Sequence, residues 1–393
     1  MQGKAVQGGI CAPLGFRAAG VTCGVKESGE ADLCILASSR RCAAAGVFTR
    51  NAFRAAPVLA TSRRLEEDGH LQAVVANSGN ANAWTGKRGL EDAETMASLV
   101  ARELGIDARD VAVASTGVIG SYLPMERIRE GIEKAAASLD EGGHLDAAKA
   151  IMTTDTRPKE VAWDFGGFIV GGMVKGSGMI RPDMATMLAF ITTDAKVEPT
   201  QLDKALRKAV DGTFNLISVD GCSSTNDMVL VLASGEAGVE LDASQMEEPL
   251  FQVCGALARQ VVEDGEGATR FIAVRVHEAS NAAEAKKAAM AVADSVLVKT
   301  AFFGGDANWG RVVQALGTVF EDVDPEPVRI RIAGITVAEA GGPVEVDREK
   351  LRRAMAGREV GLDIFLGRGE AGVEVWTCDL SYDYVKINAE YHT

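Results

Sequence analysis

Short apolar runs alternate along the chain with longer segments in which apolar residues recur three and four positions apart. The first pattern is typical of buried strands and the second of helices. In the first half the patterns predict strands at 33–37, 43–48, 73–76 and 111–114, and helices at 90–104 and 125–139. Pro124 stands just before the last of these segments, a position where proline commonly opens a helix.

The second half alternates in the same way. Two further strands, 168–174 and 187–192, flank a Gly-rich turn, and 321–327 reads as a surface connection. The remaining segments predict helices at 201–210, 249–263, 282–293 and 312–319, and strands at 228–233, 271–276, 328–332, 362–366 and 373–376. At 393 residues the chain exceeds one ordinary core. An α/β fold with two lobes is therefore expected.

Composition narrows the possible partners. Hydrophobic residues make up 47% and charged residues 24%, as in globular proteins, and the formal charge of −14 disfavours a nucleic-acid surface. No run of 18 apolar residues and no signal-peptide core is present, so neither a membrane span nor export is expected. We therefore expect a cytoplasmic protein that binds neither nucleic acid nor membrane.

Cysteine and histidine are poorly placed for metal or disulfide chemistry. The seven cysteines are irregularly spaced without a C-x-x-C pair, and the four histidines are scattered, so reduced, buried thiols and no metal site are expected. Nucleophilic chemistry in this chain therefore has to work without a histidine base.

The densest unusual segment is 171–195, with the sequence GGMVKGSGMIRPDMATMLAFITTDA. It is compatible with a phosphate-binding loop, although the order G-x-x-x-x-G-K-[ST] is absent, or with a plain Gly-rich hairpin. A third interpretation is a processing site, in which Thr186 follows the small residue Ala185 and precedes an apolar strand.

The third interpretation has a definite chemistry. A threonine hydroxyl is a weak nucleophile unless a base removes its proton, and an N-terminal threonine can use its own α-amine for this. The unperturbed pKa of an α-amine, roughly 7.7–8, suits that role near neutral pH. The Thr186 hydroxyl would first attack the Ala185 carbonyl, and water would hydrolyse the resulting ester to expose the amine.

Four other segments carry polar groups whose roles the residues alone leave open. The ASTGVIG turn, 114–120, offers backbone N–H groups and a hydroxyl to an oxyanion, or is an ordinary strand–helix loop. The others are MTTDTRPK at 152–159, EDGEGAT at 263–269, and the C-terminal KINAEYHT at 386–393. Hydroxyl-rich segments usually cap turns, loop carboxylates are usually solvated, and termini usually fray.

Taken together, these segments resemble the ornithine acetyltransferase family of arginine biosynthesis. The motifs occur in the family's order from the first thirty residues to the last: APLGFRAAGVTCGVK, NSGNANAWTG, ASTGVIG, MTTDTRPK, KGSGMIRPDMATM, SVDGCSSTND, EDGEGAT, KTAFFGGDANWGR and INAEYHT. The resemblance implies a sandwich-type α/β fold. It also implies autoproteolysis between Ala185 and Thr186 into an α chain, 1–185, and a β chain, 186–393, commonly assembled as a dimer of αβ units.

The same resemblance assigns roles to particular residues. Thr186 would be the nucleophile of both self-cleavage and acetyl transfer, and Thr116 with Gly117 would form the oxyanion hole. The substrate-contacting positions, besides Thr186 itself, would be Thr153, Lys175, Glu266, Asn388 and Thr393. Their chemistry agrees with such roles, because a lysine suits a substrate carboxylate, a glutamate an ammonium, and an asparagine an amide.

The implied reaction is a ping-pong transfer. N-acetylornithine acetylates Thr186 and ornithine leaves, after which the amine of glutamate attacks the ester to give N-acetylglutamate. No cofactor is required, and acetyl-CoA is a possible additional acetyl donor. Two alternatives stay open: a self-cleaving N-terminal-threonine amidase or aminopeptidase, and an uncleaved small-molecule binding protein. Asp183, where the family usually has asparagine, keeps the second open because its charge is expected to slow cleavage.

Overall fold

The computed structural model describes residues 3–181, 187–320 and 324–390. The chain divides into two compact units, which are described separately: residues 1–215 with 222–261, and residues 216–221 with 262–392. Both combine helices with a mixed sheet, so the expected α/β class is confirmed. Among the described helices none is long and apolar enough to cross a membrane.

The first unit is built on a sheet of nine strands in the described residues, in the order β1-β6-β7-β8-β10-β3-β4-β5 with β2 paired to β3. Its strands are β1 (Lys4–Ala5), β2 (Phe16–Val21), β3 (Leu33–Phe48), β4 (His70–Asn80), β5 (Val111–Val118), β6 (Lys159–Asp164), β7 (Ile169–Lys175), β8 (Leu188–Thr193) and β10 (Met228–Ala233). Its helices are α1 (Ala56–Asp68), α2 (Gly86–Leu104), α3 (Met125–Ala137), α4 (His144–Ala150), α5 (Pro199–Asp211) and most of α6 (Ala243–Glu263).

This sheet forms two layers that face each other, with β3 belonging to both. The first part of β3 pairs with β4 and the last part with β10. Leu36 of the first layer and Phe190 and Leu230 of the second share one buried core. Successive strand residues point to opposite faces, and Ile35 accordingly packs into a different core with α2 and α3. Strands buried on both faces read as continuous apolar runs, which is the pattern seen in the sequence.

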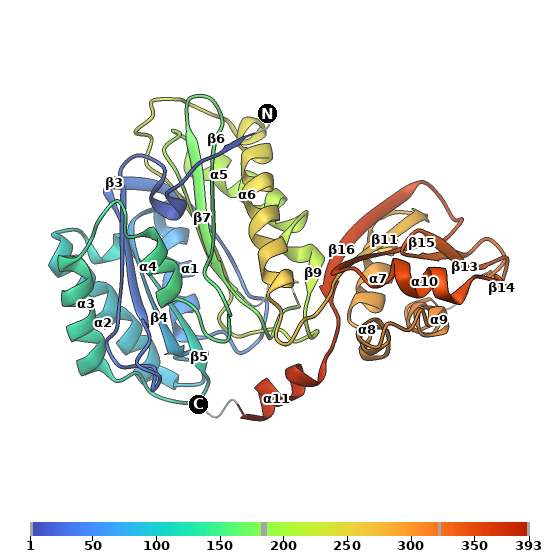
Figure 1. Ribbon diagram of the computed structural model, residues 1–393. Helices are drawn as coiled ribbons and strands as arrows, with labels where there is room; N and C mark the ends of the chain where they lie inside the picture. The colour runs from blue at the N-terminus through green and yellow to red at the C-terminus, as the bar shows by residue number, and fades with distance from the viewer. Residues whose placement is uncertain (1–2, 182–186, 321–323, 391–393) are drawn as a thin grey trace. The chain divides into compact units, whose positions relative to one another are not determined.

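Helices cover the outer faces of the two layers. Figure 1 shows α2 and α3 on the outer side of β4, and α6 beside β7 on the opposite side. The contact with α6 is close, because a Cβ placed on Gly172 of β7 would lie 3.0 Å from the side chain of Leu257. Most of the sheet is therefore shielded from solvent, and polar groups become accessible mainly where strands end.

The second unit contains a seven-stranded sheet in the order β14-β13-β12-β15-β11-β16-β9, counted over the described residues. Its strands are β9 (Ile217–Ser218), β11 (Phe271–Ala279), β12 (Arg329–Ile332), β13 (Ile335–Glu339), β14 (Gly342–Pro343), β15 (Glu359–Phe365) and β16 (Ala371–Cys378). Its helices are α7 (Ala282–Ala293), α8 (Val296–Phe303), α9 (Trp309–Gly317), α10 (Arg348–Ala354) and α11 (Tyr382–Glu390). Helices α7, α8 and α9 pack their apolar residues against this sheet.

All seven cysteines are described and none forms a disulfide. The expectation of buried thiols holds for five of them, but Cys222 is exposed and Cys23 is only partly buried. Burial raises the pKa of the Cys34 and Cys254 thiols to about 12, so these two groups stay protonated and unreactive near neutral pH.

Candidate functional site

The predicted oxyanion residues lie at the carboxyl end of β5, which runs parallel to β4. Thr116 is opposite Ser78 in the register, and Gly117 is opposite Gly79. Gly117 has φ +128°, and a Cβ there would come within 2.3 Å of the Gly79 carbonyl carbon. The position accepts only glycine, because any side chain would collide with the backbone of β4. The ASTGVIG turn therefore has a specific backbone geometry that an ordinary loop does not need.

Lys175, at the end of β7, lies beside this turn. Its Nζ donates to the Thr116 Oγ1 at 3.2 Å, and only 7% of the residue is exposed. A hydroxyl that accepts from an ammonium directs its own proton elsewhere, and such charge-assisted bonds are stronger than neutral ones. The structure thus brings together two residues that the family resemblance assigned to different roles.

A buried carboxylate that the sequence pattern did not indicate, Asp155, connects this site to the MTTDTRPK segment. It accepts from the backbone N–H of Thr153 at 3.0 Å and from that of Gly176, which follows Lys175, at 2.7 Å. Lys159 donates to it at 2.6 Å, and neither of the paired side chains is exposed. Asp155 therefore fixes the segments of Thr153 and Lys175 next to each other.

The charges around Asp155 outweigh the effect of its burial. Burial favours the neutral carboxyl, but Lys159, Lys175 and the N–H of Gly176 together hold the pKa of Asp155 below its usual value of 3.8. The group is therefore ionised near neutral pH and supplies the negative charge that two buried lysines require. The only sequence signal for it was an acid in a segment that also contains Arg157 and Lys159.

In the second unit, two predicted substrate residues contact each other. The Asn388 Nδ2 donates to the Glu266 Oε2 at 2.7 Å and to the Tyr384 carbonyl at 3.0 Å. Glu266 is only 7% exposed, although a loop carboxylate is usually solvated. Helix α11 carries Asn388 to this loop, so the C-terminal segment contributes to the site in this unit.

Three predicted positions cannot be placed. Ala185 and Thr186, with Asp183 before them, and the terminal Thr393 lie outside the described residues. The strand expected after Thr186 is present as β8, a fully buried strand in which Leu188 pairs with Lys175. The roles of Ala185, Thr186 and Thr393 stay predictions.

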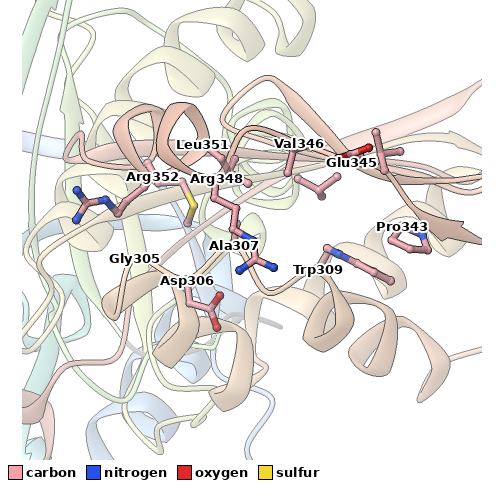
Figure 2. Close-up of a pocket in the computed structure, with 13 residues that line it drawn as sticks. Gly305, Asp306, Ala307, Trp309, Pro343, Glu345, Val346, Arg348, Leu351 and Arg352 are labelled. Carbon is pink, nitrogen blue, oxygen red and sulfur yellow. The ribbon is translucent and has the colours of Figure 1, made fainter.

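A cavity of about 730 Å³ in the second unit is separate from the described site residues. Figure 2 shows its lining from the loop before α9 and the segment leading into α10, with Arg348 directed into the space above Asp306. Of the predicted site residues that the structure describes, none lines it. The cavity therefore carries no part of the chemistry described above.

Comparison with known proteins identifies the chain. Residues 17–393 match the model of the ArgJ family. The arginine biosynthesis bifunctional protein ArgJ of Symbiobacterium thermophilum is 50% identical, with 98% of this chain and 99% of that protein covered. A solved structure of the bifunctional ArgJ protein of Bacillus halodurans is 41% identical, with a TM-score of 0.50, and covers 52% of this chain and 100% of that one.

A second solved structure, the ornithine acetyltransferase of Mycobacterium tuberculosis in complex with ornithine, is 44% identical, with a TM-score of 0.45. It covers 46% of this chain and 99% of that one. The expectation drawn from the order of the motifs is confirmed: the chain belongs to the ArgJ family.

Proposed function

We propose that the protein makes N-acetylglutamate by two routes, taking the acetyl group either from N-acetylornithine or from acetyl-CoA. Membership of the ArgJ family makes it an acyltransferase of arginine biosynthesis. Relatives that share up to 50% of its sequence over nearly the full length are described as bifunctional, which supports the use of both donors. The acetyl group would be carried by Thr186.

The observation that carries the mechanism is the bond between Lys175 and Thr116 beside the backbone of Gly117. When Thr186 attacks the acetyl carbonyl, the carbonyl oxygen becomes an oxyanion that the N–H of Gly117 and the hydroxyl of Thr116 stabilise. The ammonium of Lys175 makes that hydroxyl a better donor. Ornithine then leaves, and the glutamate amine attacks the acetyl ester through a second oxyanion held by the same groups.

Self-cleavage between Ala185 and Thr186 would prepare the nucleophile by exposing the α-amine that acts as its base. The solved Bacillus halodurans chain is matched over its whole length but covers only about half of this chain. A relative whose solved chain has half the length supports a protein that works as two pieces. The pieces would be residues 1–185 and 186–393, assembled as a dimer of αβ units. No cofactor takes part in this scheme.

The substrate roles follow the chemistry of each group. A lysine ammonium has three donors, so Lys175 can hold a substrate α-carboxylate while it bonds to Thr116. For the second unit we assign Glu266, oriented by Asn388, to the side-chain ammonium of N-acetylornithine. Thr153 and Thr393 complete the proposed set of substrate contacts.

The rival function is hydrolysis by the same nucleophile, as in an N-terminal-threonine amidase. Product analysis of the wild-type protein with N-acetylornithine, in the presence and absence of glutamate, separates the two. Transfer yields N-acetylglutamate in equal amount to ornithine and only with glutamate present. Release of acetate at the same rate with and without glutamate would establish the hydrolase instead. Thr186→Ala is the inactive control for both reactions.

A further inference from the structure

Lys26 lies in a loop whose backbone is fixed from within the fold. The buried carboxylate of Asp32 accepts from three backbone N–H groups of this loop: those of Cys23 at 2.7 Å, Val25 at 2.6 Å and Lys26 at 3.0 Å. A carboxylate that accepts three such bonds holds a loop in one conformation. The direction in which the Lys26 side chain leaves the loop is therefore set by the protein.

The aliphatic part of Lys26 lies against Gly79, in the strand pair that carries the proposed oxyanion hole. A Cβ placed on Gly79 would lie 3.1 Å from the Lys26 Cγ and 3.3 Å from its backbone nitrogen. Gly79 is the register partner of Gly117. The side chain of Lys26 thus starts directly beside the glycine pair at the ends of β4 and β5.

The ammonium of Lys26 is a partly buried charge that receives little stabilisation from its hydrogen-bond partners. Within the described residues its hydrogen-bond acceptor is one neutral group, the Ala31 carbonyl, at 2.7 Å. Burial lowers the pKa of Lys26, and the nearby ammonium of Lys175 acts in the same direction. Asp32, Asp155 and Glu30 oppose this shift without cancelling it.

Among the described residues, the two carboxylates that act most strongly on the Lys26 ammonium are already bonded to other groups. Asp32 is bonded to the loop backbone, and Asp155 is bonded to Lys159 and to backbone N–H groups. The partly buried ammonium of Lys26 has one neutral acceptor, and its side chain starts beside the glycine pair of the proposed oxyanion hole. These two features favour an anion supplied from outside. Under the proposed function, the anions that enter this site are amino-acid carboxylates.

We propose that Lys26 is a specificity-determining residue that binds the side-chain carboxylate of glutamate, while Lys175 binds the α-carboxylate. The inference rests on the proposed function. N-acetylornithine and glutamate share an α-carboxylate, but their side chains end in opposite charges, so one nucleophile serves both only if the protein offers a cation to one and an anion to the other. Lys26 supplies the cation.

The test separates the two halves of the reaction in Lys26→Met, which keeps the aliphatic stem and removes the charge. Acetylation of the enzyme by N-acetylornithine, followed by intact mass, should be unchanged from wild type. Discharge of the acetyl-enzyme by glutamate should require about 10- to 100-fold more acceptor, since one charge-assisted hydrogen bond is lost. Discharge by isotopically labelled ornithine should be unchanged, and Lys26→Arg should retain most of the glutamate reaction.

The assignment would be overturned if Lys26→Met slowed discharge of the acetyl-enzyme equally with glutamate and with ornithine. It would also be overturned if the variant slowed discharge with neither acceptor. A measurement on the wild type guards against a variant that does not fold: glutamine, which lacks the side-chain charge, should be a much poorer acceptor than glutamate. Equal use of the two acceptors by the wild type contradicts the proposal without any variant. Failure of the wild type to form an acetyl-enzyme at all would instead contradict the proposed function.

Discussion

The ammonium of Lys175 lies 3.2 Å from the hydroxyl oxygen of Thr116, although the two residues are 59 positions apart and their strands are not neighbours in the sheet. Four strands separate β7 from β5 in the strand order. In a flat sheet the spacing of about 4.8 Å between strands would place them more than 20 Å apart. The contact exists because the sheet folds into two layers that face each other across a shared core.

Removal of the Thr116 hydroxyl tests its part in the oxyanion hole. Thr116→Val should lower kcat for acetyl transfer by about 10²–10³-fold, the usual cost of one oxyanion donor, with little change in KM. Rates are divided by the fraction of cut chain, measured by intact mass, because self-cleavage also passes through an oxyanion. Thr116→Ser keeps the hydroxyl and should stay within tenfold of wild type; equal losses in both variants would argue against a donor role.

Asp155 should make the first unit sensitive to acid. Its pKa is depressed in the folded protein, so its contribution to stability is complete above the unfolded value near 3.8 and is lost as pH falls through the folded value. Asp155→Asn should cost about 3–5 kcal/mol near neutral pH, because Lys159 is left buried without its charge partner, and the cost should shrink toward pH 3.

Denaturant unfolding between pH 7 and pH 3 measures both effects of Asp155→Asn. Asp107 provides the control, since Arg109 lowers its pKa to about 2 although the group is exposed. Asp107→Asn should change stability little, because exposed pairs are screened by solvent. If Asp155→Asn and Asp107→Asn lowered the free energy of unfolding by similar amounts, burial of Asp155 would not increase its contribution to stability.

Glu266 should discriminate between the two acetyl donors. If it binds the side-chain ammonium of N-acetylornithine, Glu266→Gln should raise the KM for that donor by about 10- to 100-fold. The KM for acetyl-CoA should stay near the wild-type value, because this donor lacks the ammonium. Steady-state kinetics with each donor provides the measurement, and Glu370→Gln, at an exposed glutamate, is the matched control. A parallel rise with both donors would contradict the assignment.

Asp183 should slow self-cleavage relative to an asparagine at the same position. Asp183→Asn is expected to speed the disappearance of the 393-residue chain after synthesis, followed over time by denaturing electrophoresis. The physical reason is that a negative charge three residues before the nucleophile raises the pKa of nearby groups and disfavours an oxyanion. An unchanged or slower rate would remove Asp183 as a regulator of processing.

The sequence predicted the regular elements well where the apolar pattern was uninterrupted. The strand at 228–233 and the helix at 282–293 match β10 and α7 residue for residue. The two strands at 33–37 and 43–48 are one strand, β3, because the exposed residues 39–41 between them form an irregularity in its pairing and not a turn. Helix α6 begins at Ala243 and continues through Pro249, the residue at which the pattern predicts its start.

The family motifs predicted the residues of the candidate site, but not the buried groups that fix their positions. Glu266 and Asn388, to which the resemblance assigned one role, are in contact, and so are Thr116 and Lys175, to which it assigned different roles. The sequence pattern did not indicate Asp155 or Lys26. An acid in a hydroxyl-rich segment and a lysine in an N-terminal loop are usually solvated. Only the packing of the two layers places these residues near Lys175. The division at Ala185–Thr186 falls inside the first compact unit and outside the described residues, so it stays a prediction.

Intact mass of the denatured protein tests most directly whether Thr186, released by cleavage, carries the acetyl group. We expect two fragments of 185 and 208 residues (393 − 185 = 208), the second starting at Thr186. After incubation with N-acetylornithine alone, only the 208-residue fragment should gain the mass of one acetyl group, and glutamate should remove it. A single uncut 393-residue chain that never gains an acetyl group would contradict the account.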